Sequence, residues 1–395
     1  MKSVHIKKVE LKNYKSIASC SIKLGKINVL VGRNGAGKSN FLDALRFVKE
    51  SLEYSLDYAI KTRGGVDNVR RRSTGHPYNF QIGLEVRLPS SREVKYGFEI
   101  SVAKRGVFFV KKESLQIFNA KGERCVFYKV ENGQVVGATF DTMPPVSRDR
   151  LYLTNAAGLP EFRPVYEALL QIGLYNLNPE SIRGLQEPDM GSLLSRDGGN
   201  IASVIERMQR ECPSAIERVN SYLQVIVPDL EGVRRISLGP KETIEFKQAV
   251  EGADHPWRFH AANMSDGTLR ALGCLVAISQ LSMDDIPVRM VGIEEPETAL
   301  HPAATGSLID AIRECAEQTQ VLITTHSADL LDHIDLSEDR LFVVQSRKGT
   351  TEIGSVDQAS QEAIRDHLFT PGDLLRMDQL DLDPSSLKPQ NTFSF

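Results

Sequence analysis

The sequence predicts an α/β protein with a phosphate-binding core, an antiparallel β subdomain and a helical insertion. Residues 27–31 form an apolar, β-branched run that ends in a glycine-rich loop, and helical spacing follows that loop. Apolar and polar positions alternate through residues 79–136, as is typical of antiparallel strands. Helical patterns then alternate with short apolar strands in the last third of the chain, which indicates an α/β sheet.

Composition narrows the class of protein. The chain has 395 residues, of which 41% are hydrophobic, and its formal net charge of −3 gives no global basic field for nucleic acid. Five cysteines occur singly and without CxxC spacing, which predicts reduced thiols in a cytoplasmic protein. The N-terminal residues lack the apolar core of a signal peptide, and no run of about 18 apolar residues occurs. We therefore expect no membrane association.

Patterning divides the chain into five segments. Strand-like alternation leads to the glycine loop, and an Asn132-Gly133 pair favours a tight hairpin later in the β-rich segment. Residues 160–228 have mainly helical spacing. We expect the first part of the core at residues 1–60, the antiparallel β subdomain at 61–150, a helical or mixed insertion at 151–255, the second part of the core at 256–355, and a polar, frayed tail at 356–395.

The glycine-rich loop has the pattern that phosphate binding requires. Residues 32–39, GRNGAGKS, fit G-x-x-x-x-G-K-[ST] at every position. Glycines allow backbone N–H groups to close around a phosphate, and the start of the helix adds the positive end of its dipole. Lys38 would reach the β- and γ-phosphates, and the Ser39 hydroxyl would bind Mg²⁺. A chance glycine-rich turn is the alternative, but the flanking strand and helix patterns disfavour it.

An acidic pair and a histidine each follow a predicted strand of the last third. Glu294 and Glu295 end the strand in VRMVGIEEPETALHP, where one acid could hold Mg²⁺ and the other could activate a water molecule. Acids on the surface at a strand end are the common alternative. His326 ends the next strand, in VLITTHSADLL, where it could bond a γ-phosphate. A lone histidine is more often structural than catalytic.

Ser265 and Gly267 precede a helix whose leucines are spaced for burial. Ser-Asp-Gly-Thr is good capping chemistry, so an ordinary helix N-cap is one interpretation. The other is a second helix N-terminus exposed to phosphate. Because one nucleotide needs only one such cradle, this second cradle would serve a nucleotide bound by another copy of the chain.

Together these motifs resemble those of ABC-type ATPase heads. Their order is a glycine loop, an S-D-G-T helix, a strand ending in E-E-P-E and a strand ending in histidine. LKNYKS before the loop and EEPETALHP after the acidic strand resemble the branch that includes RecF, the SMC heads and the OLD-type ATPases. The resemblance covers residues 1–50 and 260–346, and it implies an ABC-ATPase head with a P-loop α/β core.

The resemblance implies a role for individual residues. Catalytic roles are implied for Lys38 of Walker A, Glu295 as the base of Walker B, and His326 as the switch histidine. Glu294 takes the metal side of Walker B, and residues 298–301 resemble a D-loop that crosses a dimer interface. The implied cofactors are ATP, contacted by Lys15, Gly32, Asn34, Gly35, Ala36, Gly37, Lys38, Ser39, Asn40, Ser265 and Gly267, and Mg²⁺, contacted by Ser39 and Glu294.

The sequence departs from the family pattern at three points. The signature has Ser-Asp-Gly in place of Ser-Gly-Gly, which is usual in this branch. Glu294 replaces the commoner aspartate, and its extra methylene affects direct metal ligation. The Q-loop glutamine has no secure match, and Gln81 is a weak candidate because it lies within the β-rich segment.

The sub-type follows from what accompanies the motifs. Only 69 residues follow His326, which is too few for the nuclease domain of fused OLD-type enzymes, and no heptad pattern predicts SMC-length arms. The chain therefore resembles stand-alone ATPases of bacterial anti-phage defence. That resemblance implies a homodimer or higher oligomer bridged by ATP, and a separately encoded nuclease or toxin as partner.

Two other functions remain open. One is a RecF-like ATPase of DNA repair or recombination, and the other is an ATP-dependent scaffold with little turnover. DNA is a candidate ligand for the defence ATPase and for the RecF-like repair ATPase. Arg63, Arg70, Arg71 and Arg72 lie in a glycine-containing loop and predict a local nucleic-acid patch, with an ion-paired loop as the equal alternative.

Overall fold

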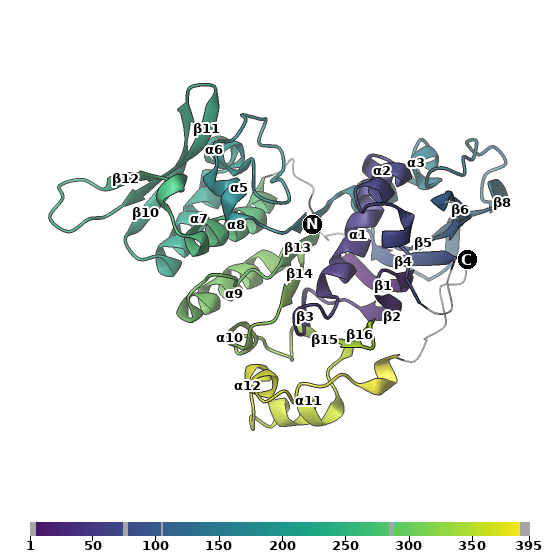
Figure 1. The fold of residues 1–395 in the computed structure, drawn as a ribbon. Helices are drawn as coiled ribbons and strands as arrows, with labels where there is room; N and C mark the ends of the chain where they lie inside the picture. The colour runs from purple at the N-terminus through teal and green to yellow at the C-terminus, as the bar shows by residue number, and fades with distance from the viewer. Residues whose placement is uncertain (1–4, 74–77, 104–105, 284–287, 289, 388–395) are drawn as a thin grey trace. The chain divides into compact units, whose positions relative to one another are not determined.

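The computed structural model describes residues 5–73, 78–103, 106–283, 288 and 290–387 (Figure 1). The chain divides into two compact units. Unit 1 comprises residues 1–172, 340–365 and 380–395, and unit 2 comprises residues 173–339 and 366–379. The fold is mixed α/β, as the sequence predicts.

Unit 1 is built on a mixed sheet whose strand order is β8-β7-β6-β5-β4-β1-β2-β16-β15-β3. Strands β15 and β3 are parallel, whereas β15 pairs with β16, and β1 with β2 and β4, in antiparallel fashion. The strands are β1 (His5–Tyr14), β2 (Ile17–Lys23), β3 (Ile27–Val31), β4 (Asn79–Arg87), β5 (Glu93–Val102), β6 (Phe108–Phe118), β7 (Arg124–Glu131), β8 (Gln134–Ala138), β15 (Arg340–Arg347) and β16 (Thr350–Ser355).

The predicted antiparallel β segment is present as β4 to β8, each paired with the next. The tight hairpin lies where the sequence places it, because Glu131 pairs with Gln134. Asn132 (φ 49°) and Gly133 (φ 84°) between them both have positive φ. These are the dihedrals that an Asn-Gly turn supplies and that match the twist of the flanking strands.

Helix α1 (Lys38–Glu53) packs on this sheet through aromatic side chains. The fully buried Phe47 ring meets Phe80 of β4 edge-on, with 5.6 Å between the ring centroids, and Tyr14 of β1 lies at 5.9 Å. Such edge-on aromatic pairs stabilise a core beyond the area that they bury. Unit 1 also contains α2 (Leu56–Lys61), η1 (Val66–Asn68), α3 (Leu153–Ala156) and α4 (Arg163–Leu170).

Unit 2 has a parallel strand pair and a separate antiparallel sheet. Strands β13 (Met290–Glu294) and β14 (Gln320–Thr325) are parallel, and β9 (Ile172–Tyr175) follows β13 in the strand order. The other sheet contains β10 (Leu230–Leu238), β11 (Lys241–Gln248) and β12 (Trp257–His260), at the far left of Figure 1. The helices are α5 (Pro179–Arg183), α6 (Ile201–Glu211), α7 (Pro213–Ile226), η3 (Ala261–Asn263), α8 (Asp266–Ser279), η4 (Gln280–Ser282), α9 (Pro302–Ala316) and α10 (Ala328–Leu331).

The C-terminal segment is not frayed through residue 387, which corrects the sequence-based expectation. It forms α11 (Gln358–Arg365), α12 (Pro371–Arg376) and η5 (Pro384–Leu387). Thr370 and Asp373 make a capping box at the start of α12, and Leu382 is buried where it bridges to Val356. The polar composition of this segment led to the prediction of fraying, although one capping box and a few buried apolar side chains are enough to order it. Residues 388–395 lie outside the described residues.

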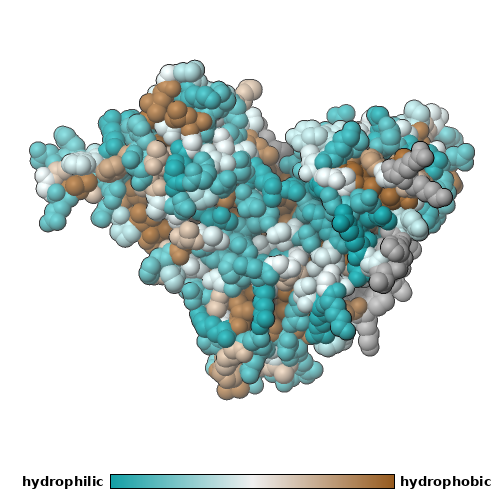
Figure 2. Space-filling view, viewed as in Figure 1, coloured by the Kyte–Doolittle hydropathy of each residue, from teal (hydrophilic) through white to brown (hydrophobic). Residues whose placement is uncertain are grey.

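Hydrophilic residues predominate on the face shown in Figure 2, where hydrophobic residues occur in separate groups. Apolar side chains of the strands and of α1 and α8 are mostly buried. Within the described part of the chain, no helix has both the length and the apolar character that a membrane span needs.

Candidate nucleotide site

The glycine-rich loop of unit 1 lies between the wholly buried strand β3 and the start of α1. Gly35 (φ 77°) and Gly37 (φ 108°) have positive φ, a region that favours glycine. The N-cap residue of α1 is Gly37, which has no side chain to cap the helix. The first N–H groups of this helix therefore have the arrangement that binds an anion at a helix N-terminus.

Two strands distant in sequence enclose the loop. A Cβ atom on Gly32 would lie 2.1 Å from the Val344 carbonyl oxygen of β15, and one on Gly37 would lie 2.1 Å from Thr351 Oγ1 of β16. Thr351 Oγ1 also donates to the Ala36 carbonyl at 2.7 Å. These close approaches explain why both positions are glycine. Sequence reasoning missed Thr351, because a threonine in a strand carries no signal of such a contact.

The predicted lysine and hydroxyl groups lie at the start of α1. Lys38 is only 4% exposed, and its ammonium donates to the carbonyl oxygens of Gly32 (2.8 Å) and Arg33 (3.3 Å). The ammonium thus lies within the curve of the loop. Ser39 is exposed, and Asn40 donates through Nδ2 to Ser16 Oγ at 2.6 Å.

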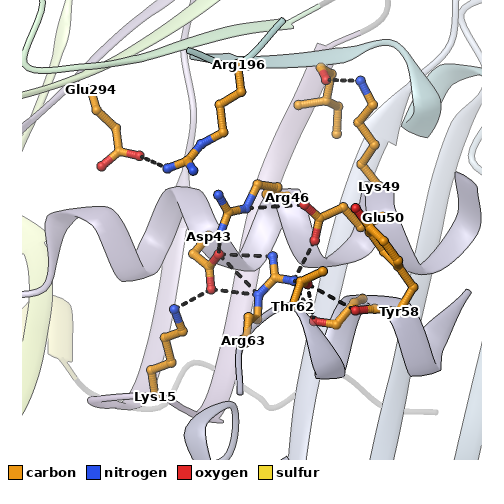
Figure 3. Close-up of polar contacts among 12 residues, drawn as sticks. Lys15, Asp43, Arg46, Lys49, Glu50, Tyr58, Thr62, Arg63, Arg196 and Glu294 are labelled. Carbon is orange, nitrogen blue, oxygen red and sulfur yellow. Dashed lines mark hydrogen bonds and ion pairs between the residues drawn. The ribbon is translucent and has the colours of Figure 1, made fainter. Parts of the chain in front are cut away.

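Lys15 is held by an acid on α1. Its ammonium lies 2.6 Å from Asp43 Oδ2, and the same carboxylate accepts a hydrogen bond from Arg63 Nε (Figure 3). Asp43 Oδ2 also accepts from Tyr14 OH at 2.8 Å. Burial alone would raise the pKa of Asp43, but its bonds to Arg63 and the charges of Lys15 and Arg46 outweigh burial and hold that pKa well below its usual value. Asp43 is therefore an ionised anchor for Lys15.

Arg63 is part of this anchor, which corrects the prediction that it belongs to a nucleic-acid patch. Its side chain is 3% exposed, pairs with Asp43 and Glu50, and stacks over the Phe47 ring. The other loop arginines lie nearer the surface. Arg70 pairs with Asp67, Arg71 donates to Thr350 Oγ1, and Arg72 donates to the Asp67 carbonyl and Asn68.

In unit 2, the predicted acids lie at the end of β13. Glu294 stands opposite Thr324 of β14 in the parallel register, and Glu295 N donates to the Thr324 carbonyl at 2.9 Å. Glu295 has a φ of 46°, a conformation that is strained for a side chain with a Cβ atom. Nδ1 of His326, one residue after β14, lies 3.2 Å from Glu295 Oε1. The structure therefore brings the predicted base and the predicted switch histidine together.

A buried arginine that sequence reasoning missed fixes this strand end. Arg270 of α8 is 8% exposed and donates to the carbonyl oxygens of Glu294 (2.8 Å), Glu295 (3.1 Å) and Leu177 (2.8 Å). Its one signal in the sequence was a charged residue within a helix that is otherwise largely apolar. Bonds from a charged donor stabilise more than neutral ones, so Arg270 holds the backbone of both acids.

Glu297 was also missed. Its Oε1 accepts from Thr325 Oγ1 at 2.5 Å, and Thr325 Oγ1 accepts from Ser327 N at 2.9 Å. Burial raises the pKa of Glu297, and the bond from Thr325 opposes that effect. This chain of bonds brackets His326 on both sides along the backbone.

Ser265 and Gly267 have local explanations in unit 2. Ser265 is the N-cap of α8 and accepts from Thr268 N at 3.2 Å, as the capping interpretation predicts. A Cβ atom on Gly267 would lie 2.3 Å from the Ala299 carbonyl oxygen in the predicted D-loop. Gly267 therefore permits close packing of that loop. His301 caps α9 by accepting from Ala303 N.

The two residues predicted to hold Mg²⁺ belong to different units, Ser39 to unit 1 and Glu294 to unit 2. Across the described ranges, no three or more His, Cys, Asp or Glu side chains gather as a metal cluster. Mg²⁺ beside ATP takes most of its ligands from phosphates and water, with one or two protein oxygens. The Ser39 hydroxyl and the Glu294 carboxylate are oxygen donors of that kind. Gln81, the weak Q-loop candidate, lies in β4 and donates to Glu99 Oε2.

Comparisons with known proteins agree with these motifs. Residues 4–131 match the family described as "AAA ATPase domain", and residues 192–332 match "AAA domain, putative AbiEii toxin, Type IV TA system". Old nuclease of Escherichia phage P2 is 20% identical over 358 residues, which are 83% of this chain and 57% of that protein. The chain thus spans little more than half the length of this curated relative.

Solved structures give the same fold. An SMC head bound to the C-terminal winged-helix domain of ScpA matches with a TM-score of 0.56 at 17% identity, covering 90% of this chain and 99% of that one. An SMC head with an extended coiled coil, bound to the C-terminal domain of ScpA derived from Pyrococcus furiosus, matches with a TM-score of 0.54 at 14% identity, covering 92% and 99%. Two separate regions of the chain thus match AAA ATPase family models, and the fold is similar to that of SMC ATPase heads. The chain has a mixed α/β fold similar to that of the SMC heads.

Proposed function

We propose that this ABC/AAA-type protein binds and hydrolyses ATP with Mg²⁺. The observation that carries the proposal is the buried strand, glycine loop and uncapped helix start around Lys38. An ammonium within such a loop neutralises charge on the β- and γ-phosphates. The backbone N–H groups supply hydrogen bonds that need no rearrangement, because the glycines already have the required dihedrals.

The acids and the histidine of unit 2 have the chemistry for the hydrolytic step. Glu295 would accept a proton from the attacking water, and His326 would hold the Glu295 carboxylate in place through Nδ1. Glu294 and Ser39 would hold Mg²⁺, which when bound neutralises phosphate charge. Arg270 keeps both acid backbones fixed, so the carboxylates need little ordering when ATP binds.

We also propose that two copies form the working unit. Lys38 and Ser265 each lie at a helix N-terminus, and a two-fold head-to-head pair would let the Ser265 helix of one copy cover ATP held by the other. The SMC-head fold supports this arrangement as an analogy. Nucleotide-driven pairing of this kind would couple ATP turnover to DNA engagement or to a partner effector.

The biological role that we favour is anti-phage defence, in the cytoplasm, with a separately encoded nuclease or toxin. The similarity to Old nuclease of phage P2, and to a family whose description names a putative AbiEii toxin and a type IV TA system, supports this role. A RecF-like repair ATPase is the second candidate, because the family resemblance covers that branch equally. An adjacent gene for a small nuclease or toxin that co-purifies with this protein would favour defence.

The decisive experiment is Lys38→Ala. Loss of the ammonium should abolish both equilibrium binding of a fluorescent ATP analogue and Mg²⁺-dependent phosphate release. Lys61→Ala is the matched control, because Lys61 is exposed on α2 and pairs only locally with Asp57 among the contacts described. Turnover that survives in Lys38→Ala would reject the assignment of the loop. Nucleotide binding without turnover in the unaltered protein would favour the ATP-dependent scaffold.

A further inference from the structure

Arg196, in the segment before α6, contacts the acid assigned to the metal. Its Nη2 donates to Glu294 Oε1 at 3.2 Å, and both residues belong to unit 2 (Figure 3). The Glu294 side chain is 16% exposed and that of Arg196 is 48% exposed. An arginine at the surface therefore reaches inward to an acid that is mostly buried.

The backbone beneath Arg196 is held on both sides. The Arg196 and Asp197 carbonyl oxygens accept from Asn176 N (2.9 Å) and Asn178 N (3.0 Å), which extend beyond β9. Further bonds fix the flanking residues: Leu194 N donates to Gln280 Oε1, Ser195 N to Asn200 Oδ1, and Gly199 N to Asp197 Oδ1. Gly198, with a φ of 83°, packs against Ile182. A segment with this many anchors presents its arginine from a fixed position.

An incidental surface ion pair is the plain alternative, since such pairs contribute about 0–1 kcal/mol. Two observations disfavour it. Arg270 already holds the Glu294 carbonyl, so side-chain torsions are the remaining freedom of that residue. A glutamate has one more such torsion than the aspartate that is commoner at this position, and an unrestrained carboxylate would sample several rotamers.

We propose that Arg196 is a positioning residue for Glu294. Its guanidinium binds one carboxylate oxygen of Glu294 and so restricts the longer side chain, and the other oxygen would be the one available to hold magnesium. This inference rests on the proposed function, because it assumes that Glu294 binds the metal that accompanies ATP. Removing a residue that hydrogen-bonds a metal ligand commonly changes metal affinity by about 10–100-fold.

The test measures binding rather than turnover. A fluorescent ATP analogue is titrated into the full chain at stepped Mg²⁺ concentrations, and the Mg²⁺ concentration that gives half-maximal binding is recorded. Arg196→Ala should raise that concentration by about tenfold. Arg210→Ala is the matched control, because Arg210 is exposed on α6 and pairs with its neighbour Glu211. It should leave the value unchanged.

A second background separates positioning from other roles. In Glu294→Asp the shorter side chain should not reach the Arg196 guanidinium. Adding Arg196→Ala to that variant should therefore change the half-maximal Mg²⁺ concentration by less than about twofold, because both changes remove the same interaction. An equal rise in both backgrounds would overturn the inference, because Arg196 would then act on another group. The inference would also be overturned if Arg196→Ala, in the protein that keeps Glu294, left the half-maximal Mg²⁺ concentration unchanged or lowered it. A lowered concentration would identify Arg196 as a competitor of the metal.

The control arms keep this result distinct from failure of the proposed function. If the unaltered chain binds no nucleotide at any Mg²⁺ concentration, the proposed function fails and Arg196 is not its cause. If the unaltered chain binds with clear Mg²⁺ dependence and Arg196→Ala behaves as Arg210→Ala does, the positioning role alone is rejected. Urea unfolding of each variant shows whether the fold is retained, and Arg196→Lys, which keeps the charge, should restore part of the affinity.

Discussion

His326 Nδ1 and Glu295 Oε1 lie 3.2 Å apart at the ends of two parallel neighbouring strands. The parallel register brings them together, because it sets Glu294 beside Thr324 and thereby places the next residues of both strands at one edge. The partner of Glu295 is an imidazole, whereas the partner of Glu294 is the Arg196 guanidinium. This relationship favours a catalytic role for Glu295 over Glu294.

Glu295→Gln should retain ATP binding and lose hydrolysis, because an amide cannot accept the proton of the attacking water at neutral pH. The variant should accumulate as an ATP-bound dimer, which gel filtration with Mg²⁺ and ATP would detect. Glu294→Gln should instead weaken Mg²⁺-dependent binding. If Glu294→Gln stalls hydrolysis with binding intact while Glu295→Gln still turns over, the two roles are reversed.

Thr325→Val should loosen the turn that carries His326. The substitution removes the hydroxyl that links Glu297 Oε1 to Ser327 N and leaves a buried carboxylate oxygen without that donor. The free energy of unfolding should fall by about 1–3 kcal/mol, and ATP turnover should fall while nucleotide affinity is retained. Thr325→Ser, which keeps the hydroxyl, should behave like the unaltered protein. Equal turnover in the valine and serine variants would show that Thr325 does not position His326 for hydrolysis.

Mixed dimers should recover activity that neither parent has. Lys38→Ala and Ser265→Arg homodimers should both be inactive, because every site lacks the Lys38 ammonium in the first and has an arginine in place of the Ser265 hydroxyl in the second. Random mixing makes half of the dimers heterodimers, each with one doubly altered site and one unaltered site, so roughly a quarter of full activity could return. Labelled subunits must confirm that exchange occurs. Exchange without any recovery would contradict a site shared between copies.

Arg63→Ala should act on folding rather than on DNA. Removing this guanidinium leaves the buried Asp43 carboxylate without its main partner, and such losses destabilise by about 3–5 kcal/mol. Arg72→Ala, at an exposed position, should cost less than about 0.5 kcal/mol. If the loop contacts DNA, replacing Arg70, Arg71 and Arg72 should lower the salt dependence of binding by up to about one unit of slope per lost phosphate contact. An unaltered slope would exclude these arginines as phosphate contacts.

Glu113 in β6 should make stability depend on pH near neutrality. Burial raises the pKa of Glu113 to about 7, and bonds from Tyr152 N, Leu153 N and two tyrosine hydroxyls only partly offset it. The folded state therefore binds a proton more tightly than the unfolded chain. The stability that protonated Glu113 contributes is fully present below the unfolded pKa, near 4.5, and is lost as pH rises through about 7. The loss approaches about 3 kcal/mol.

The measurement is urea unfolding between pH 4.5 and 8, compared with Glu113→Gln. The glutamine variant should be less stable at the acid end, because its amide faces the Tyr152 N–H donor, and it should lack this pH dependence. Parallel pH profiles in the two proteins would show that Glu113 does not titrate in this range.

Local patterns predicted the fold well because they describe neighbouring residues. The strand, glycine loop and helix around Lys38 follow each other directly, and the Asn132-Gly133 turn is specified by two adjacent residues. Frayed structure was wrongly expected for residues 356–387, since a capping box and a few buried leucines suffice to order a polar segment.

The supporting contacts of the site could not be predicted, because each joins residues far apart in the chain. Arg270 holds the backbone of acids 24 and 25 positions away, Thr351 contacts Ala36, and Arg196 reaches Glu294. A single sequence gives the residue types but not these pairings. Arg63 was assigned to the surface for the same reason. The arginine-rich loop suggested a surface role, but Asp43 and Glu50, which are distant in sequence, pair with Arg63 and bury it.

The left-handed backbone at Glu295 places this position at odds with stability. A glycine would relieve a conformation that costs a residue with a Cβ atom about 1–2 kcal/mol, yet it would remove the carboxylate that contacts His326. Evolution toward greater thermal robustness alone would thus favour losing the acid. The proposed role of Glu295 as the catalytic base gives a reason for an acid at this strained position, and directed evolution for heat tolerance should monitor this codon first.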